Sequence, residues 1–311
     1  MKAIILKEFG NTDNLIEKEL PLPVAKNDEV LIQVKAISIN PVDIKTRKGK
    51  SLGPSLKDED PLILGWDVSG VVVETGSSVS GFKIGDEVFG MINFPGHGKA
   101  YAEYVAAPAS HLALKPENVS HEEAAAATLA ALTAWQILVT HVNIKAGDGV
   151  LITAAAGGVG HYAVQIAKYL GAYIIGVSSA ANKDFVMQLG ADEHIDYATQ
   201  KIEQAVDNID LVIDAMGDNV DPLLAVTKKG GTVVTLPSGG KDMTENAKSK
   251  GVHWHHYSVV SNGKDQQAIA ELLANGKIRS FVSQKFHLSD IAEAHHQIES
   301  GKTKGKIVTV I

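Results

Sequence analysis

The sequence predicts an α/β protein that combines a doubly wound parallel sheet domain with a second, β-rich domain. Strand-like and helix-like segments alternate from about residue 148 to residue 236, which is typical of a parallel sheet with crossover helices. Residues 1 to about 110 contain strand-like runs without helical patterns between them, which favours a compact barrel-like or sheet domain. A run of small residues at 154–160 joins a strand directly to a helix.

The composition fits two soluble domains and argues against several functions. The 311 residues are 45% hydrophobic and 21% charged, which is ordinary for an α/β protein with a substantial core. A net charge of -7 offers no basic field for a polyanion, so we expect no nucleic-acid partner. The sequence contains no cysteine, which excludes disulfides, zinc–thiolate sites and a cysteine nucleophile.

No membrane partner and a cytoplasmic location are expected. No apolar run approaches the length of a membrane span. Met1 leads directly into the strand-like KAIIL, which leaves no room for a signal peptide. The lack of cysteine is compatible with a reducing compartment.

The N-terminal third predicts short strands separated by prolines and glycines. From residue 121, an alanine-rich helical segment begins with Glu122 and Glu123, which suit a helix N-terminus. Further along, the expected strands are Gly149–Thr153, Tyr173–Val177, Ile209–Ala215, Thr232–Leu236, His255–Val260 and Lys306–Ile311. The expected helices lie at Asn182–Leu189, Val220–Thr227, Gln266–Leu273 and Asp290–Glu299.

The small residues after the strand at 149–153 form a dinucleotide fingerprint. Ala155, Gly157 and Gly160 have the spacing GxGxxG with alanine in the first place, and Gly158 and Val159 lie between the last two. Small residues let the main chain approach a pyrophosphate, and the following helix N-terminus supplies free N–H groups. A glycine-rich turn without a ligand is the alternative interpretation.

The end of the next strand favours NADP(H) over NAD(H). NAD-preferring proteins carry a carboxylate there that binds the ribose hydroxyls. This chain has Ser178 and Ser179, followed by Asn182 and Lys183, which could donate charge-assisted hydrogen bonds to a 2′-phosphate. Alternatively, Ser178 merely ends the strand and Asn182 caps the next helix.

The whole chain resembles the zinc-free quinone oxidoreductases and enone reductases, the zeta-crystallin-like group of the medium-chain dehydrogenase/reductase superfamily. The motifs that carry the resemblance are Asn40–Lys45, Leu64–Gly70, Gly85–Gly90, Tyr101–Val105, Leu132–Trp135, Ala155–Gly160, Leu189–Asp192 and Gly305–Val308. Individually these motifs are weak, but their order along the chain is highly specific.

The resemblance implies a GroES-like substrate-binding domain of residues 1–120 and 264–311, and a Rossmann domain of residues 121–263 that binds the nucleotide. The active site would lie in the cleft between them, and we expect a homodimer. Zinc-dependent relatives carry a cysteine within the segment matching Asn40–Asp43 and a Gly-His-Glu where this chain has Gly65-Trp66-Asp67. Both ligands are absent, which argues against an alcohol dehydrogenase, whose alkoxide needs a metal.

The resemblance also implies roles for individual residues. In similar plant enone reductases, a lysine matching Lys45 lies near the nicotinamide and the substrate oxygen, so Lys45 is the candidate hydrogen-bond donor to a developing enolate. Asn40 would hold the nicotinamide side of the cleft, and Thr133 would meet its carboxamide. The alternative for Lys45 is a solvated loop lysine beside Arg47 and Lys48.

Two further cofactor contacts follow from the resemblance. Tyr197 matches a tyrosine that stacks near the adenosine phosphate, with a core aromatic at a strand end as the alternative. Lys306 either approaches the cofactor or lies at the surface.

The histidines at 253, 255 and 256 have no acid or cysteine beside them, so a structural role is favoured over a metal site. His97 lies in a loop expected to border the cleft.

We therefore expect an NADPH-dependent, metal-free oxidoreductase that transfers hydride to quinones or α,β-unsaturated carbonyls. A nucleotide-binding protein with little turnover, as in the crystallin-like members, is the alternative from another class. A carrier-linked enoyl reductase would need a basic entrance, which the charge balance does not support.

Overall fold

The computed structural model describes residues 1–237 and 240–311. The chain divides into two compact units, Met1–Leu132 with Val259–Ile311 (unit 1) and Thr133–Ser258 (unit 2). The first boundary thus falls at 132 rather than at the expected 120, because the helix after residue 120 packs on strands of unit 1. The second boundary falls at 258 rather than at the expected 263, so that residues from Val259 onward are part of unit 1.

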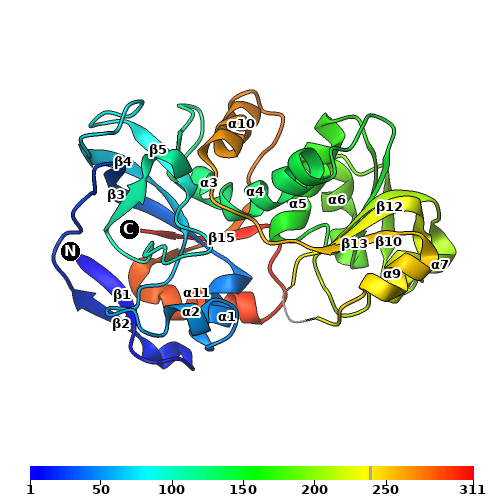
Figure 1. Cartoon of the computed structure of the whole chain (residues 1–311), viewed down its shortest axis with the longest axis horizontal. Helices are drawn as coiled ribbons and strands as arrows, with labels where there is room; N and C mark the ends of the chain where they lie inside the picture. Colours follow the sequence, from blue (N-terminus) through cyan, green and yellow to red (C-terminus); the bar gives the residue numbers. More distant parts are fainter. Residues whose placement is uncertain (238–239) are drawn as a thin grey trace. The chain divides into compact units, whose positions relative to one another are not determined.

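Unit 1 is built on a seven-stranded sheet with the order β14-β15-β3-β4-β5-β7, with β6 also paired to β3. Figure 1 shows the C-terminal strand β15 next to the N-terminal strand β3, which an antiparallel register confirms. The strands of unit 1 are β1 Lys2–Leu6, β2 Leu15–Glu19, β3 Glu29–Ile39, β4 Asp67–Thr75, β5 Glu87–Met91, β6 Tyr104–Pro108, β7 Ala113–Leu114, β14 Val282–His287 and β15 Lys306–Val310.

Short helices join and cover these strands. They are α1 Pro41–Arg47, α2 Gly53–Leu56, α3 His121–Ala126, α10 Gly263–Ala274 and α11 Ile291–Glu299, with 3-10 turns at Thr12–Asn14, Ala109–His111 and Leu288–Asp290. Helix α3 begins at Ser120, whose hydroxyl accepts a hydrogen bond from Glu123 N while the Glu123 carboxylate accepts one from Ser120 N. Helix α3 then contacts β3, β4 and β15.

The alanine-rich segment from 121 is not one helix, as the sequence predicts, but three pieces. Helix α3 ends at Ala126, α4 runs from Leu129 to Trp135 across the boundary of the units, and a π-helical piece spans Gln136–His141. The first break occurs because the Thr128 hydroxyl donates to Ala125 O at 2.7 Å and Leu129 N donates to a buried carboxylate, Asp67, at 3.1 Å. These two hydrogen bonds therefore outweigh the local helix propensity of the alanines.

Unit 2 is a parallel six-stranded sheet with the order β10-β9-β8-β11-β12-β13. This is the strand order of the doubly wound Rossmann fold, with the switch point between β8 and β11. The strands are β8 Gly149–Ile152, β9 Tyr173–Ser178, β10 Glu193–Asp196, β11 Ile209–Asp214, β12 Thr227–Thr235 and β13 His253–His256. The expected strand at His255–Val260 therefore begins two residues earlier and ends at His256.

The helices of unit 2 alternate with its strands, which confirms the predicted fold class. They are α5 Gly158–Tyr169, α6 Lys183–Gln188, α7 Ile202–Ala205, α8 Asp221–Val226 and α9 Thr244–Lys250, with a 3-10 turn at Ala180–Asn182. Buried aliphatic side chains of the sheet, such as Leu151, Val212 and Val233, form its core with Leu224 of α8. Within the described residues, no helix is both long and apolar enough to cross a membrane.

Candidate active site

The fingerprint turn of unit 2 lies at the switch point of the sheet, directly after β8. Ala154 adopts a left-handed conformation with φ 47°, and Ala155 N donates to Val177 O of the neighbouring strand at 3.0 Å. Helix α5 begins at Gly158, and no side chain caps its first turn. The free N–H groups of this first turn, bordered only by small residues, are suited to a pyrophosphate.

Gly157 and Gly160 have different reasons to be glycine. A Cβ at Gly160 would lie 2.2 Å from Ala154 O and 2.7 Å from Ala155 Cα, so helix and turn meet with no room for a side chain. A Cβ at Gly157 would lie 3.1 Å from Ala154 O, which a small shift of the turn can accommodate. Gly160 therefore serves the packing of the turn, while Gly157 leaves its outer surface open.

The ends of the neighbouring strands hold this turn in place. The Thr153 hydroxyl donates to Asp214 Oδ1 at the end of β11 and accepts from Ala215 N at 2.9 Å. Asp214 also accepts hydrogen bonds from Met216 N, Gly217 N and the Thr235 hydroxyl of β12. This buried aspartate ties three strand ends together, a role the sequence did not indicate.

The segment expected to bind the 2′-phosphate is only partly free to do so. Ser178 is buried, and its hydroxyl pairs with His194 Nε2 at 2.8 Å. Ser179 and Asn182 are half-buried and hydrogen-bonded to each other at 3.3 Å. Lys183 is exposed at the start of α6, and its ammonium has no hydrogen bond or ion pair with any described residue. Lys183 is thus the most available cationic donor of this segment.

For two residues next to this segment, Tyr197 and Asp196, the structure differs from the sequence-based interpretation. Tyr197 is 65% exposed and follows β10, so its interpretation as a core aromatic is wrong. Asp196, which the sequence reasoning missed, pairs with Ser178 in the register of β9 and β10. Hydrogen bonds from Ala198 N and the Thr199 hydroxyl hold the pKa of its carboxyl below the usual range. The segment therefore carries one ionised acid as well as its donors.

In unit 1, helix α1 presents Lys45 between two fixed ends. At its start, Asn40 N donates to Asp43 Oδ2 at 2.7 Å and Asp43 N donates to Asn40 O at 3.0 Å, which closes the first turn. At its end, the buried Arg47 guanidinium pairs with Glu299 of α11 at 2.6 Å.

The lysines of this helix end differ in their pairing. Lys48 also binds Glu299, at 2.5 Å. Lys45 is half-buried, and its ammonium makes no hydrogen bond or ion pair within the described part of the chain. Of the three cations at 45, 47 and 48, only Lys45 is therefore available to a ligand.

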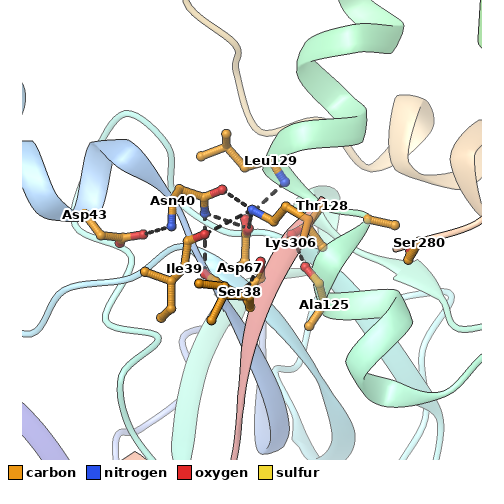
Figure 2. A network of polar contacts seen from close by, with 12 residues as sticks. Ser38, Ile39, Asn40, Asp43, Asp67, Ala125, Thr128, Leu129, Ser280 and Lys306 are labelled. Carbon is orange, nitrogen blue, oxygen red and sulfur yellow. Dashed lines mark hydrogen bonds and ion pairs between the residues drawn. The ribbon is translucent and has the colours of Figure 1, made fainter. Parts of the chain in front are cut away.

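A buried polar cluster lies where the end of β3 meets the starts of β15 and β4 in the unit 1 sheet. Figure 2 shows the side chains of Lys306, Asn40 and Asp67 directed at one another. Lys306 Nζ donates to Asn40 Oδ1 and, at 3.2 Å, to Ile39 O, and lies 3.9 Å from Asp67 Oδ2. Asn40 Nδ2 donates to Asp67 Oδ2 at 2.8 Å, while Leu129 N donates to Asp67 Oδ1 at 3.1 Å.

Burial perturbs the titration of every ionisable group in this cluster. It raises the pKa of Asp67, and the Lys306 ammonium opposes that shift. It lowers the pKa of Lys306, with Asp67 and Asp43 acting against it. The pKa of Asp43 rises to about 8, mainly through burial, and the nearby Asp67 carboxylate adds to the rise. Asp43 is therefore largely protonated at pH 7, and the attraction between Lys306 and Asp67 opposes the effect of burial on both of those groups.

The expectations for Lys306 and Asn40 need revision. Lys306 is 4% exposed, so a surface role is wrong, and its donors are directed at its own unit. Its direct contact with a nucleotide stays a prediction that this burial disfavours. Asn40 is 1% exposed, with its amide committed to Lys306 and Asp67. Thr133 is buried in α4, and its contact with the carboxamide also stays a prediction.

A second buried group extends from Asp43 toward α11. Tyr101, fully buried, faces the Asp43 carboxyl, and its hydroxyl lies 3.0 Å from His295 Nε2. Burial lowers the pKa of His295 to about 3, so this imidazole is neutral. Helical periodicity in the sequence does not reveal this contact, because the buried tyrosine comes from another segment of the chain.

The other histidines have structural surroundings. His97 Nε2 contacts the main chain of Ile63, at 2.9 Å to its carbonyl, and His97 Nδ1 lies 2.9 Å from Glu59. His97 thus pins its loop within unit 1. The rings of His253 and His255 stack 6.5 Å apart on β13, and His141 meets His255 edge-on. Among the described residues, no three acidic or histidine side chains gather as metal ligands would.

Comparisons with known proteins agree with this architecture. Residues 26–117 match the family model for the alcohol dehydrogenase GroES-like domain, and residues 189–309 match a model described as zinc-binding dehydrogenase. The chain is 36% identical to the 2-methylene-furan-3-one reductase of Solanum lycopersicum over 99% of its length and 78% of the relative's. It is also 36% identical to the NADPH-dependent alkenal/one oxidoreductase of Arabidopsis thaliana, covering 99% of this chain and 79% of that protein.

A solved structure has the same fold over the whole chain. The quinone oxidoreductase of Coxiella burnetii superposes with a TM-score of 0.95 at 37% identity, covering 100% of this chain and 99% of that one. Both the β-rich unit and the parallel-sheet unit are therefore shared with enzymes of one superfamily. The chain belongs to the quinone oxidoreductase and enone reductase group of the medium-chain dehydrogenase/reductase superfamily.

Proposed function

We propose that this protein uses NADPH to reduce quinones or α,β-unsaturated carbonyls, without a bound metal, and that Lys45 donates the hydrogen bond that stabilises the developing enolate. The names of its relatives support the substrate class and the reaction. The observation that carries the role of Lys45 is its pairing state, since Arg47 and Lys48 are held by Glu299 and Lys45 is not.

The residues of unit 2 fit a nicotinamide nucleotide. The turn at 154–160 has no side chain larger than valine, and the uncapped start of α5 offers N–H groups to a pyrophosphate. Lys183, with Ser179 and Asn182 beside it, would hold the 2′-phosphate of NADPH, and Tyr197 would cover the adenosine side. When bound, the cofactor supplies the hydride.

The chemistry left to the protein is modest. Hydride adds to the electron-poor β-carbon of an enone, and negative charge develops on the carbonyl oxygen. A positioned N–H donor stabilises that charge far more in a water-poor site than in solution. The half-buried Lys45 ammonium, free of a protein partner, can donate to this oxygen. The α-carbon of the resulting enolate then takes a proton from solvent.

This scheme needs no metal. At the segments that match the zinc ligands of relatives, unit 1 has the ammonium of Lys306. In zinc-dependent relatives, the resemblance places ligands at the segments of Asn40–Asp43 and Gly65–Asp67. Here the Asn40 amide and the Asp67 carboxylate bind each other and the Lys306 ammonium. This donor set lacks the thiolate and imidazole that zinc prefers, which supports the metal-free assignment.

The test is steady-state kinetics of Lys45→Met on one enone and one quinone, with NADPH affinity measured by fluorescence quenching. Methionine keeps the packing of the stem but removes the donor. We expect turnover on the enone to fall about 100-fold, because one oxyanion donor is typically worth that much. The quinone should be less affected, since it yields an aromatic hydroquinone. The NADPH affinity should stay unchanged.

Lys48→Met is the matched control, because Lys48 lies on the same helix end, is 48% exposed and shares Glu299 with Arg47. Wild-type turnover of Lys45→Met on both substrates would refute the role of Lys45. Stoichiometric NADPH binding without oxidation by any quinone, enal or enone would instead favour a nucleotide-binding protein with little turnover.

A further inference from the structure

The ammonium of Lys306 is buried in a set of oxygen atoms that the sheet register brings together. Ile39 pairs with Ile307 across β3 and β15, and Ser38 pairs with Asp67 across β3 and β4. The end of β3 therefore lies between the start of β15, which carries Lys306, and the start of β4, which carries Asp67. Three chain segments far apart in sequence thus meet at neighbouring strand ends (Figure 2).

The main chain fixes where Lys306 enters this cluster. Gly305 adopts φ +59°, and a Cβ there would lie 2.2 Å from Phe281 O. Lys306 N donates to the same carbonyl at 2.8 Å. The direction of the Lys306 side chain is thus set by a glycine turn and a strand-edge hydrogen bond, and the ammonium has little freedom to move elsewhere.

The cluster fixes the orientation of the Asn40 amide. Its oxygen accepts from the Lys306 ammonium, and its Nδ2 donates to the Asp67 carboxylate. A flipped amide would set Nδ2 against the ammonium and its oxygen against the carboxylate, and both contacts would be repulsive. The charge pair therefore permits one amide orientation only.

Asn40 is also the residue that caps the start of α1. Its main-chain N and O both bind Asp43 in the first turn of that helix. Helix α1 has only seven residues, and its other end is held by the ion pair between Arg47 and Glu299. Movement at Asn40 would therefore shift Lys45, which lies between these two anchors.

From these contacts we propose that Lys306 is a positioning residue for Lys45. Its ammonium, held by Ile39 O, the Asn40 amide and the Asp67 carboxylate, locks the start of α1 and so sets where Lys45 presents its own ammonium. This inference rests on the proposed role of Lys45 as the donor. It differs from a cofactor contact, because within the described residues the Lys306 ammonium contacts Ile39, Asn40 and Asp67 of its own unit.

The test is a double-mutant cycle on enone reduction with Lys45→Met, Lys306→Met and the double variant. We expect Lys306→Met to lower kcat about 10- to 100-fold, the loss typical of a reacting group misplaced by about 1 Å. The NADPH dissociation constant should stay within about twofold of wild type. Because Lys306 acts through Lys45, the double variant should have the kcat of Lys45→Met alone.

Lys302→Met is the control, since Lys302 is exposed in the same C-terminal segment. If Lys306→Met does not fold, as judged by circular dichroism, Asp67→Asn replaces it in the cycle, because asparagine keeps an acceptor for Leu129 N while removing the charge that orders Asn40. The same non-additivity with Lys45→Met is then expected.

The outcomes separate this inference from the proposed function. Losses that multiply in the double variant would show that Lys306 acts independently of Lys45, and wild-type kcat in Lys306→Met would overturn its positioning role. In both cases a slow Lys45→Met would leave the proposed function standing. A Lys45→Met enzyme of normal rate would instead remove the donor on which the inference rests.

Discussion

The turn at 154–160 in unit 2 and the Lys306 cluster in unit 1 are suited to their tasks by opposite means. The turn has almost no side chains, its residues are consecutive, and no side chain caps the helix that follows it. The cluster is made of charged and amide side chains from three separate strand ends, and it is closed to solvent. At Gly160 the turn has no room for an added atom, whereas the side chains of the cluster depend on one another as hydrogen-bond partners.

The largest expected effect tests the first half of this comparison. Gly160→Val should abolish NADPH binding and destabilise unit 2 strongly, because its Cβ would overlap Ala154 O and the branched side chain needs still more space. Gly157→Ala is the control and should fold, since the nearest atom to its Cβ is Ala154 O at 3.1 Å. Thermal melts with and without NADPH provide the measurement.

A Gly160→Val protein with wild-type melting temperature and NADPH affinity would show that the turn can move and that its close packing is not required. Gly157→Ala should lower the NADPH affinity without changing the melting temperature of the free protein. The difference between the two variants separates packing from ligand contact within one turn.

A smaller effect is expected at Lys183, which is exposed at the start of α6. Lys183→Ala should weaken NADPH binding by about 1.5–3 kcal/mol, as for the loss of one charge-assisted phosphate contact, and leave NADH binding unchanged. Ser178→Ala should change little by comparison, because the Ser178 hydroxyl is already paired with His194. Fluorescence titration with both cofactors measures these affinities. Equal losses for NADPH and NADH would mean that Lys183 does not read the 2′-phosphate.

The smallest expected effect is a dependence of stability on pH. It arises in the Lys306 cluster and the adjacent Asp43, because these groups are ionisable and the residues of the turn are not. The Asp43 pKa of about 8 in the folded chain, against an ordinary 3.8, means that the folded state holds a proton that the unfolded chain releases between those pH values. Stability should therefore fall as pH rises from 3.8 to about 8 and level off at higher pH. The groups facing Asp43 are Asp67, Lys306 and Tyr101.

His295 acts with the opposite sign at lower pH. Its folded pKa of about 3 lies below its ordinary 6.5, so it lowers stability as pH falls through that interval. Between pH 6.5 and 8 the Asp43 contribution should dominate, with a slope of about 1.4 kcal/mol per pH unit at most.

Asp43→Asn should flatten this fall while keeping the acceptor for Asn40 N. Urea unfolding at five pH values between 6.5 and 8.5 measures the slope. His295→Gln is the control, because it should change only the acid side of the profile. An unchanged slope in Asp43→Asn would place the titrating group elsewhere.

The turn could be predicted from the sequence because its physics is local. A strand, a run of small residues and a helix must follow one another in the chain, so the spacing of Ala155, Gly157 and Gly160 is visible in the sequence. The parallel sheet could be predicted for the same reason, since its strands and helices alternate. The resemblance added Lys45, which no periodicity distinguishes from Arg47 and Lys48.

What only the tertiary structure decided is which side chains are already paired. Asn40, Asp67 and Lys306 meet because antiparallel register aligns the ends of β15, β3 and β4, and sequence separation hides that register. Glu299 lies far along the chain from Arg47 and Lys48, yet its ion pairs with them leave Lys45 as the free cation. Residue types and local spacing therefore determined the fold class and the nucleotide turn. Pairing between strands and helices decided which lysine is free to donate and which one is locked in place, because hydrogen bonds and ion pairs depend on distances that only the folded chain defines.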